Sequence, residues 1–247
     1  MKRSYWEKIA PSYTDEIFDV LAHDKKKIIS SAIKKIASRQ KTVMDIGCAI
    51  GKWLPVLSPL FKKVYAVDIS EKNLRIASKL HSDLDNVEYL RVDMSGRKKL
   101  PACDAAICIN AILTSSLKDR ERFFHSLPAC LKNNGHLILT VPSLESYLLS
   151  SIIANQWKID RDVLNVKLSP QKARSKWEQI RQGNADIDNV PTKHYLKEEL
   201  QLLLNRVNLV PESFHKIEYK WDTEFLKPPK WLKDPKPWDW MVIARKK

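Results

Sequence analysis

Short apolar runs alternate with stretches of helical period through the middle of the chain. The runs at residues 43–46, 64–67 and 104–110 have the length of buried strands, and another at residues 137–141 follows a glycine turn. The segments between them place their apolar positions at the spacing of one helix face. This alternation predicts a parallel sheet with helices on both faces, and such sheets bind ligands beyond the carboxyl ends of their strands.

The beginning of the chain departs from this alternation. Aromatic side chains are frequent in residues 5–22, and this segment predicts a helical flap that precedes the first core strand. Ile29, Ile33 and Ile36 then recur at helical spacing, which predicts a helix with one face on the core.

A second departure lies after the fifth predicted strand. Two helix-like stretches and a polar turn at residues 183–186 interrupt the strand pattern, which predicts a helical cap inserted over the crevice. Two tryptophans of this segment, Trp157 and Trp177, either line a substrate pocket or hold the cap to the core.

The end of the chain returns to the core pattern. A helix that begins near Thr192 as its N-cap is followed by strands at residues 212–221 and 238–244. A proline-rich stretch at 227–237 is interpreted as a second wall of the predicted pocket, with an ordinary surface loop as the alternative. The chain therefore divides into an N-terminal helical flap, an α/β core, an inserted helical cap, and a C-terminal helix with a strand pair, at residues 1–40, 41–143, 144–195 and 196–247.

The charge of the chain is strongly basic but evenly spread. The formal net charge is +14, and the excess is +4, +5 and +5 in residues 1–40, 41–143 and 144–247. A basic surface favours nucleic acid, yet no segment behaves as a basic arm. The short clusters at residues 25–27 and 97–99 are either solvated surface or phosphate contacts.

Other features exclude several classes of protein. The N-terminus lacks the apolar stretch of a secretion signal, and no apolar run approaches the roughly 18 residues of a membrane helix, so we expect a soluble, cytoplasmic protein without a membrane partner. Four cysteines lack the spacing of a metal site or a radical iron–sulfur cluster, and we expect buried reduced thiols and no metal. These are Cys48, Cys103, Cys108 and Cys130.

The turn after the first strand carries the strongest chemical signal. Gly47 and Gly51, two of only five glycines, stand where a strand runs into a helix, so the backbone there passes close to another group, with a ligand as the natural candidate. Asp68 ends the next strand, where a carboxylate accepts the hydroxyls of a ribose. The spacing differs from the Gly-x-Gly-x-x-Gly cradle of a pyrophosphate. Turn and acid together predict a nucleotide-type cofactor site.

The motif Asp-x-Gly-x-x-x-Gly, followed by a strand that ends in Asp, resembles the class I S-adenosylmethionine-dependent methyltransferase family. Asp45, Gly47 and Gly51 match the first motif and Asp68 the second, while Ala49 stands where the family usually has glycine. The resemblance covers residues 43–143. It implies a Rossmann-like methyltransferase fold: a doubly wound, seven-stranded, mostly parallel sheet with an antiparallel last strand, plus a helical cap.

The resemblance also implies the cofactor and its binding residues. S-adenosyl-L-methionine is the cofactor and S-adenosyl-L-homocysteine the product. Aromatic rings of the flap fold over this sulfonium cofactor in similar enzymes, although here the rings equally fit simple packing on the core. Asn110 follows the fourth strand, where metal-dependent members carry an acid, so an amide favours metal-independent transfer. The cofactor residues implied are Tyr5, Trp6, Tyr13, Asp45, Gly47, Cys48, Gly51, Asp68, Ile69, Asp93, Met94 and Asn110.

Methyl transfer needs alignment rather than a nucleophilic side chain of the protein. A base is needed only for a protonated acceptor, and His194, with Tyr195 and Glu224 behind it, is the candidate. The main hypothesis is transfer to an oxygen or nitrogen of a small molecule. An RNA methyltransferase, favoured by the charge, and a non-catalytic cofactor-binding module, favoured by Ala49, are the alternatives. The sequence does not define the oligomeric state.

Overall fold

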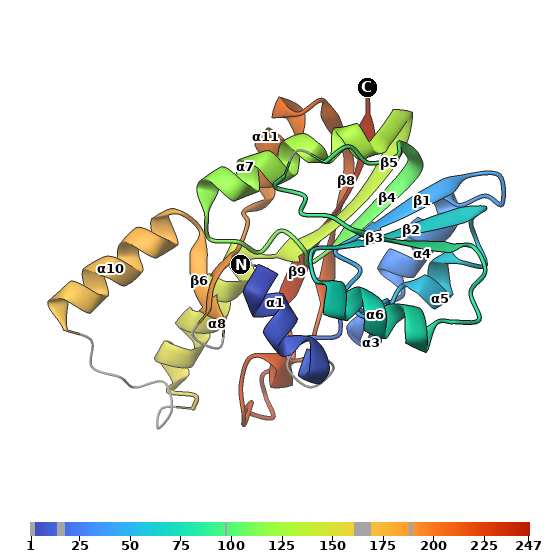
Figure 1. Cartoon of the computed structure of the whole chain (residues 1–247). Coiled ribbons are helices and arrows are strands. Elements are labelled where there is room, and N and C mark those ends of the chain that lie inside the picture. Colours follow the sequence, from blue (N-terminus) through green and yellow to red (C-terminus); the bar gives the residue numbers. More distant parts are fainter. Residues whose placement is uncertain (1–2, 14–17, 97, 161–168, 188–189) are drawn as a thin grey trace.

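The computed structural model describes residues 3–13, 18–96, 98–160, 169–187 and 190–247 (Figure 1). A seven-stranded sheet with the order β3-β2-β1-β4-β5-β9-β8 forms its centre. Only β9 is antiparallel to its neighbours β5 and β8, as the sequence predicts for the last strand. The strands are β1 (Thr42–Ile46), β2 (Lys63–Asp68), β3 (Val87–Arg91), β4 (Cys103–Ile109), β5 (Leu131–Pro142), β8 (Leu209–Glu218) and β9 (Trp238–Lys246).

One face of the sheet is covered by α4 (Ile28–Ile36), α5 (Leu54–Leu57) and α6 (Glu71–Leu80). Ile29 and Ile33 of α4 pack with Val43 of β1 and Ile138 of β5 in one buried apolar layer. The helical spacing of these isoleucines therefore marks a core-facing helix, as predicted.

The opposite face is covered by α7 (Leu117–Ser126) and α11 (Lys197–Arg206). Phe124 of α7 and Leu200 of α11 pack with Met44 of β1 and Leu137 of β5. Because strand residues alternate between the two faces, both faces of β1 and β5 are buried, which explains their continuous apolar runs. The doubly wound fold predicted from the sequence is confirmed.

The flap consists of α1 (Arg3–Ile9), the 3₁₀ turn η1 (Ala10–Ser12) and α3 (Val20–His23). It is fixed to the core at the start of α6, where the Glu7 carboxylate accepts hydrogen bonds from the amides of Glu71 at 2.9 Å and Lys72 at 3.4 Å. A carboxylate at this end of a helix satisfies free amides and complements the helix dipole. Figure 1 shows α1 beside α6 at the edge where the parallel strands end.

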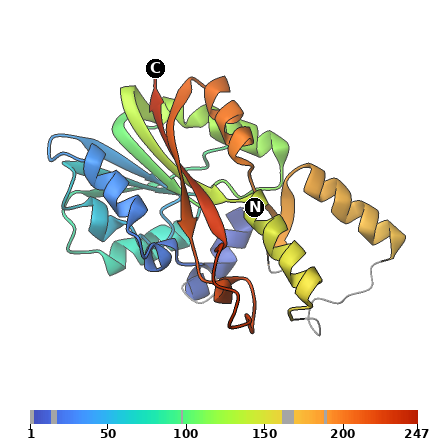
Figure 2. The same ribbon diagram turned by 180° about the vertical axis from the view of Figure 1, so that it is seen from behind.

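The segment predicted as a cap contains α8 (Leu144–Trp157), α10 (Pro170–Arg181) and the hairpin of β6 (Asn184–Ile187) and β7 (Val190–Lys193). Ile153 of α8 packs with Trp221 of the 3₁₀ turn η3 (Trp221–Thr223) and with Phe225. By contrast, no residue of α10 is buried, and this helix projects away from the sheet (Figures 1 and 2).

Several local predictions in this region are wrong. The turn predicted at residues 183–186 is mostly strand β6, and Thr192 lies on β7 rather than capping a helix. The helix begins instead after Leu196, whose backbone amide donates a hydrogen bond to the Glu199 carboxylate. Trp177 is 62% exposed on α10, so neither role predicted for it, lining a pocket or holding the cap to the core, fits its position.

Trp157 and the proline-rich stretch meet at the surface. The rings of Trp157 and Trp231 lie 5.3 Å apart, and both side chains are about half exposed. Next to them Leu232 is buried in the cluster formed by α8 and η3. Trp157 therefore packs against residues 227–237, and a wall of a substrate pocket at this place stays a prediction. No helix in the described ranges has both the length and the apolarity to cross a membrane.

Candidate active site

The turn after β1 brings two loops into contact at the carboxyl edge of the sheet. Gly47 has φ +75°, and a Cβ placed on it would lie 2.4 Å from Cβ of Ala111, which follows β4. The amides of Gly47 and Cys48 both donate to the Val67 carbonyl, at 2.7 and 3.0 Å. Glycine is thus required at position 47 by conformation and by space.

Gly51 serves a different purpose. Its φ is +83°, and a Cβ there would lie 2.7 Å from Leu54 and 2.9 Å from His81, on α5 and directly after α6. Close packing of helices therefore accounts for glycine at position 51. No ligand is needed to explain it. Ala49 between the two glycines also has a left-handed backbone, with φ 48°, which suits the glycine usual in the family better than alanine.

Asp68, at the end of β2, holds the turn from the neighbouring strand. Its carboxylate accepts hydrogen bonds from the amides of Ala49 at 3.0 Å and Ser70 at 2.7 Å. Burial raises the pKa of Asp68, while these two bonds oppose the rise. Ile69, the next residue, is half-buried. The Asn73 side chain also hydrogen-bonds the Asp68 carboxylate, which has about four acceptor sites, so some capacity remains for a ligand.

Asp45, at the end of β1, is a buried acid that lacks a partner. Among the described residues no group hydrogen-bonds its Oδ2. Burial, and then the charge of Asp68, raise the pKa of Asp45 to about 8. Buried polar atoms are nearly always paired. A buried oxygen without a partner in the protein is therefore expected where a polar ligand binds. The residues fit the cofactor that the motif implies.

The pKa of Asp45 leads to a test by stability. An acid whose folded-state pKa lies above its unfolded value binds more protons when folded, so stability falls as pH rises from about 4 to about 8. Asn cannot ionise, so we expect the free energy of unfolding of Asp45→Asn to rise relative to that of the wild type as pH increases, by roughly 1 kcal/mol per pH unit at most within this window. Urea unfolding at several pH values measures the difference, and a pH-independent difference would contradict the assignment.

The flap brings Tyr13 to the two acids. Burial, and then the neighbouring Asp68 carboxylate, raise the pKa of the Tyr13 phenol, and Asp45 adds to the rise. The Lys52 ammonium lies 6.0 Å from the centre of the Tyr13 ring and 2.8 Å from a carboxylate oxygen of Asp19. Tyr13, predicted from the resemblance, therefore lies in the same crevice as the motif residues.

The other aromatic residues of the flap have a more local setting. Tyr5 and Trp6 of α1 form an edge-to-face pair with ring centres 5.2 Å apart. Both side chains are half-buried, on the helix that docks against α6. Their contact with a cofactor stays a prediction.

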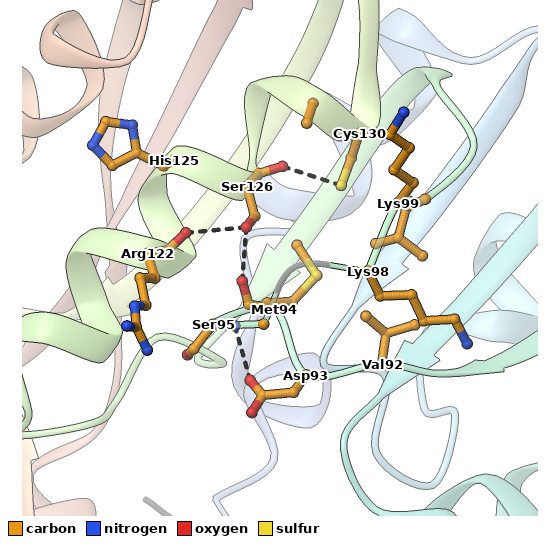
Figure 3. A pocket seen from close by; sticks show the side chains of 13 residues that line it. Val92, Asp93, Met94, Ser95, Lys98, Lys99, Arg122, His125, Ser126 and Cys130 are labelled. Carbon is orange, nitrogen blue, oxygen red and sulfur yellow. Dashed lines mark hydrogen bonds between the residues drawn. The ribbon is translucent and has the colours of Figure 1, made fainter.

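Asp93 and Met94 follow β3 and line a cavity of about 720 Å³ beside α7 (Figure 3). The exposed Asp93 carboxylate accepts a hydrogen bond from the Ser95 amide at 2.8 Å, and Ser126 of α7 donates to the Met94 carbonyl at 2.8 Å. The remaining charged lining is basic, from Lys98, Lys99, Arg122 and His125. Arg97 of the predicted basic cluster lies outside the described residues, and a phosphate contact there stays a prediction.

Asn110 connects the motif side of the crevice to the last strand. Its backbone has φ 49°, and its amide nitrogen Nδ2 donates to Oδ2 of Asp239 on β9 at 2.9 Å. The hydroxyl of Tyr219 donates to the same oxygen, also at 2.9 Å. Burial raises the pKa of Asp239 to about 6. A buried acid thus lies directly beside the predicted contact residue.

The sequence reasoning missed Asp239 and Tyr219. One signal was present, because Asp239 is the only charged residue in the run from Trp238 to Ala244, and this strand lies between two others in the sheet. A charge in a buried strand carries a large desolvation cost and is retained only for a reason.

The predicted base His194 is buried and neutral. Burial lowers its pKa to about 4, its Nδ1 lies 3.0 Å from the Thr192 carbonyl oxygen, and its ring lies 5.2 Å from that of Tyr147. In the described parts of the chain its contacts are with Thr192 and Tyr147 and not with the motif acids, and its role as a base stays a prediction.

The position of Tyr195 differs from the predicted one. It is fully buried in the apolar layer under α7 and α11, and its hydroxyl donates to the Ile112 carbonyl at 2.9 Å. A hydroxyl enclosed in this way does not reach an acceptor, so the structure gives Tyr195 a packing role instead of a catalytic one. Cys48, also predicted near the cofactor, is a free and buried thiol, as are the other three cysteines.

The fold and the crevice define a class of protein. The sheet order with one antiparallel strand, the glycine turn and the acids after β1 and β2 are those of a Rossmann-like protein that binds a nucleoside cofactor at its carboxyl edge. A family described as a methyltransferase domain matches residues 19–210. The chain belongs to this family, within the class I S-adenosylmethionine-dependent methyltransferases, and S-adenosylmethionine is its cofactor.

Solved structures share the fold at low sequence identity. A SAM-dependent methyltransferase from Methanosarcina mazei is 18% identical, with a TM-score of 0.62 over 87% of this chain and 96% of the other. The 1,6-didemethyltoxoflavin-N1-methyltransferase of Burkholderia thailandensis, bound to 1,6-didemethyltoxoflavin and S-adenosylhomocysteine, is 15% identical, with a TM-score of 0.63 over 99% and 86%. The N-methyltransferase NodS of Bradyrhizobium japonicum, in complex with S-adenosylhomocysteine, is 10% identical, with a TM-score of 0.63 over 99% and 97%. A comparison with curated proteins gave no match.

Proposed function

We propose that this protein transfers a methyl group from S-adenosylmethionine to an oxygen or nitrogen atom of a small molecule by metal-independent in-line displacement. The observation that carries the proposal is the meeting of three segments at one edge of the sheet. Asp45 and Asp68 come from β1 and β2, and the β4 loop that bears Asn110 touches Gly47. Similar structures that act on small molecules, such as the toxoflavin enzyme, support the acceptor class.

Each residue has a distinct task in this mechanism. When bound, S-adenosylmethionine supplies an electrophilic methyl group on a positively charged sulfur. Asp68 has acceptor capacity left for the ribose hydroxyls, and we assign Asp93 to the edge of the adenine, as the family resemblance implies. Tyr13 of the flap closes the crevice and excludes water, which matters because displacement at a sulfonium is faster in a dry, aligned site. No protein nucleophile is required.

Metal independence rests on the residues around Asn110. Mg²⁺ and Ca²⁺ are usually held by several oxygen ligands, whereas Asp239 is the one carboxylate hydrogen-bonded to Asn110, and within the described residues no three His, Cys, Asp or Glu side chains gather as metal ligands. Positioning by hydrogen bonds is therefore the role that we assign to Asn110.

RNA remains the alternative acceptor because the net charge is +14. Nucleic-acid binding that depends on phosphate contacts weakens steeply as salt rises. A third alternative is a module that binds the cofactor without turnover, to which the strained alanine at position 49 lends support.

One experiment separates these functions. The protein is incubated with methyl-labelled cofactor and a cell extract, and the label is separated into small molecules, RNA and protein. We expect label in the small-molecule fraction, and its loss with Asp68→Ala. Label in a ribonuclease-sensitive fraction would replace the proposal with the RNA alternative, and tight cofactor binding without any label would favour the non-catalytic module.

A further inference from the structure

Acidic groups gather around Tyr219, which shares Asp239 with Asn110, in a chain that is basic overall. Burial raises the pKa of Tyr219 well above its usual value, and the carboxylates of Asp239, Asp24 and Glu224 raise it further. Asp24 is already engaged, since its two oxygens accept hydrogen bonds from the amides of Ile28 and Ile29 at the start of α4. The local charge is therefore opposite to the net charge of +14.

Asp239 is the acid of this group that faces the cofactor side. Its two hydrogen bonds, from Asn110 and Tyr219, come from neutral donors and reach the same oxygen, Oδ2. In the described parts of the chain no cationic side chain forms an ion pair with it. A buried carboxylate without a cation carries an uncompensated desolvation cost.

Two further acceptor atoms lie close by without donors. Within the described residues, Oδ1 of Asn110 and Oγ1 of Thr140 are buried and lack a hydrogen-bond partner. Thr140 of β5 pairs with Ile109, and its carbonyl oxygen accepts a hydrogen bond from the backbone amide of Asn110 at 2.9 Å. In the sheet Thr140 pairs with Met241, two residues from Asp239 on the same strand, so both side chains point to the same face.

These atoms call for a ligand that donates hydrogen bonds and carries positive charge. The carboxylate of Asp239 and the amide oxygen of Asn110 are acceptors only, and the Thr140 hydroxyl accepts as well as donates. An ammonium group has donors and no acceptor, whereas a carboxylate or phosphate ligand would face the like charge of Asp239.

We propose that Asp239, Asn110 and Thr140 form the acceptor subsite for a small primary or secondary amine, with Asp239 as counter-ion and proton acceptor. This inference rests on the proposed methyltransferase function and specifies its substrate class. The amine enters as its ammonium form and gives one proton to the Asp239 carboxylate, which becomes a carboxylic acid. The freed nitrogen lone pair forms the bond to the methyl carbon, the bond from that carbon to sulfur breaks, and its electron pair stays on the sulfur of S-adenosylhomocysteine.

The electrostatics around Asp239 make this proton transfer less unfavourable. Burial raises the pKa of Asp239 to about 6, and the same desolvation favours a neutral amine over an ammonium ion. The other titratable groups that face Asp239 are Tyr219 and Glu224, with His23 beside Tyr219 at 6.2 Å between ring centres. Lys216 of β8 lies over the Trp238 ring, on the other face of the sheet.

The test uses paired acceptors and a matched variant. The full-length protein is given methyl-labelled cofactor with a panel of primary and secondary amines, each paired with the alcohol or phenol of the same carbon skeleton. We expect label in amines only, and a fall in kcat of about 100-fold or more for Asp239→Asn with cofactor affinity unchanged. Asp222→Asn, an exposed acid on η3, serves as the control and should behave as wild type.

Further outcomes keep the inference separate from the function on which it rests. Label in alcohols or phenols but not amines would overturn the amine subsite and leave the methyltransferase intact, whereas no label in any acceptor would count against both. Tyr219→Phe adds a readout that does not need Asp239→Asn to fold. Loss of its hydrogen bond should raise the pKa of Asp239 and move the acidic limb of the pH–rate profile to higher pH. An unmoved limb would exclude Asp239 as the proton acceptor.

Discussion

Asp68→Ala is expected to weaken binding of S-adenosylmethionine about 100-fold, because two hydrogen bonds from ribose hydroxyls to a charged acceptor contribute roughly 3 kcal/mol together. The same change removes the acceptor for the amides of Ala49 and Ser70, so the turn that frames the cofactor is also loosened. Titration calorimetry with the cofactor and with S-adenosylhomocysteine measures the loss.

Two controls separate the two effects of this change. Asp85→Ala removes an exposed acid after α6 and should leave affinity unchanged. Asp68→Asn keeps an acceptor oxygen but loses the charge, and should fall between wild type and Asp68→Ala. Full affinity in Asp68→Ala, with the fold retained by circular dichroism, would mean that Asp68 only supports the loop.

Gly47→Ala is expected to lower the free energy of unfolding by about 3 kcal/mol, which combines left-handed backbone strain with a steric clash. The added Cβ would lie 2.4 Å from Cβ of Ala111, and both belong to backbone segments that cannot simply move aside. For a chain of this size the loss corresponds to a fall in Tm of roughly 6–12 °C. Thermal unfolding in the absence of cofactor measures it.

A double-variant cycle identifies the contact. Ala111→Gly removes the opposing Cβ, so the pair Gly47→Ala with Ala111→Gly should recover part of the loss while the backbone strain persists. Strictly additive effects of the two changes would show that these loops do not touch. The cycle also tests whether the β1 and β4 loops form one crevice, on which both proposals depend.

The predictable part of the site is the part encoded in short stretches of sequence. Gly47 and Asp68 were found because a glycine at a strand-to-helix turn and an acid at a strand end are local patterns with local physical causes. Gly51 matched the same pattern for another reason, since its neighbours are side chains on and beside helices α5 and α6. A motif therefore marked the turn correctly without telling which neighbour each glycine makes room for.

The acceptor side was not predictable in this way. Asn110 and Asp239 are 129 positions apart and meet only because β9 is inserted beside β5. Tyr195 showed a different limit, because it stands beside the predicted cap in the sequence, whereas its pairing with Ser143 draws it under the helices. The role of its neighbour His194 as a base stays a prediction.

The sequence by itself determined the doubly wound class and the cofactor turn, while the antiparallel last strand was implied by the resemblance of its motifs to the methyltransferase family. Apolar alternation and turn residues act over a few positions, so they can be read without knowing what packs against them. The tertiary structure alone decided which glycine faces the β4 loop, that α10 buries none of its residues, and that Asp239, Asn110 and Tyr219 share one hydrogen-bonded cluster. Such contacts follow from strand register and burial, which are properties of the whole sheet and of no single segment.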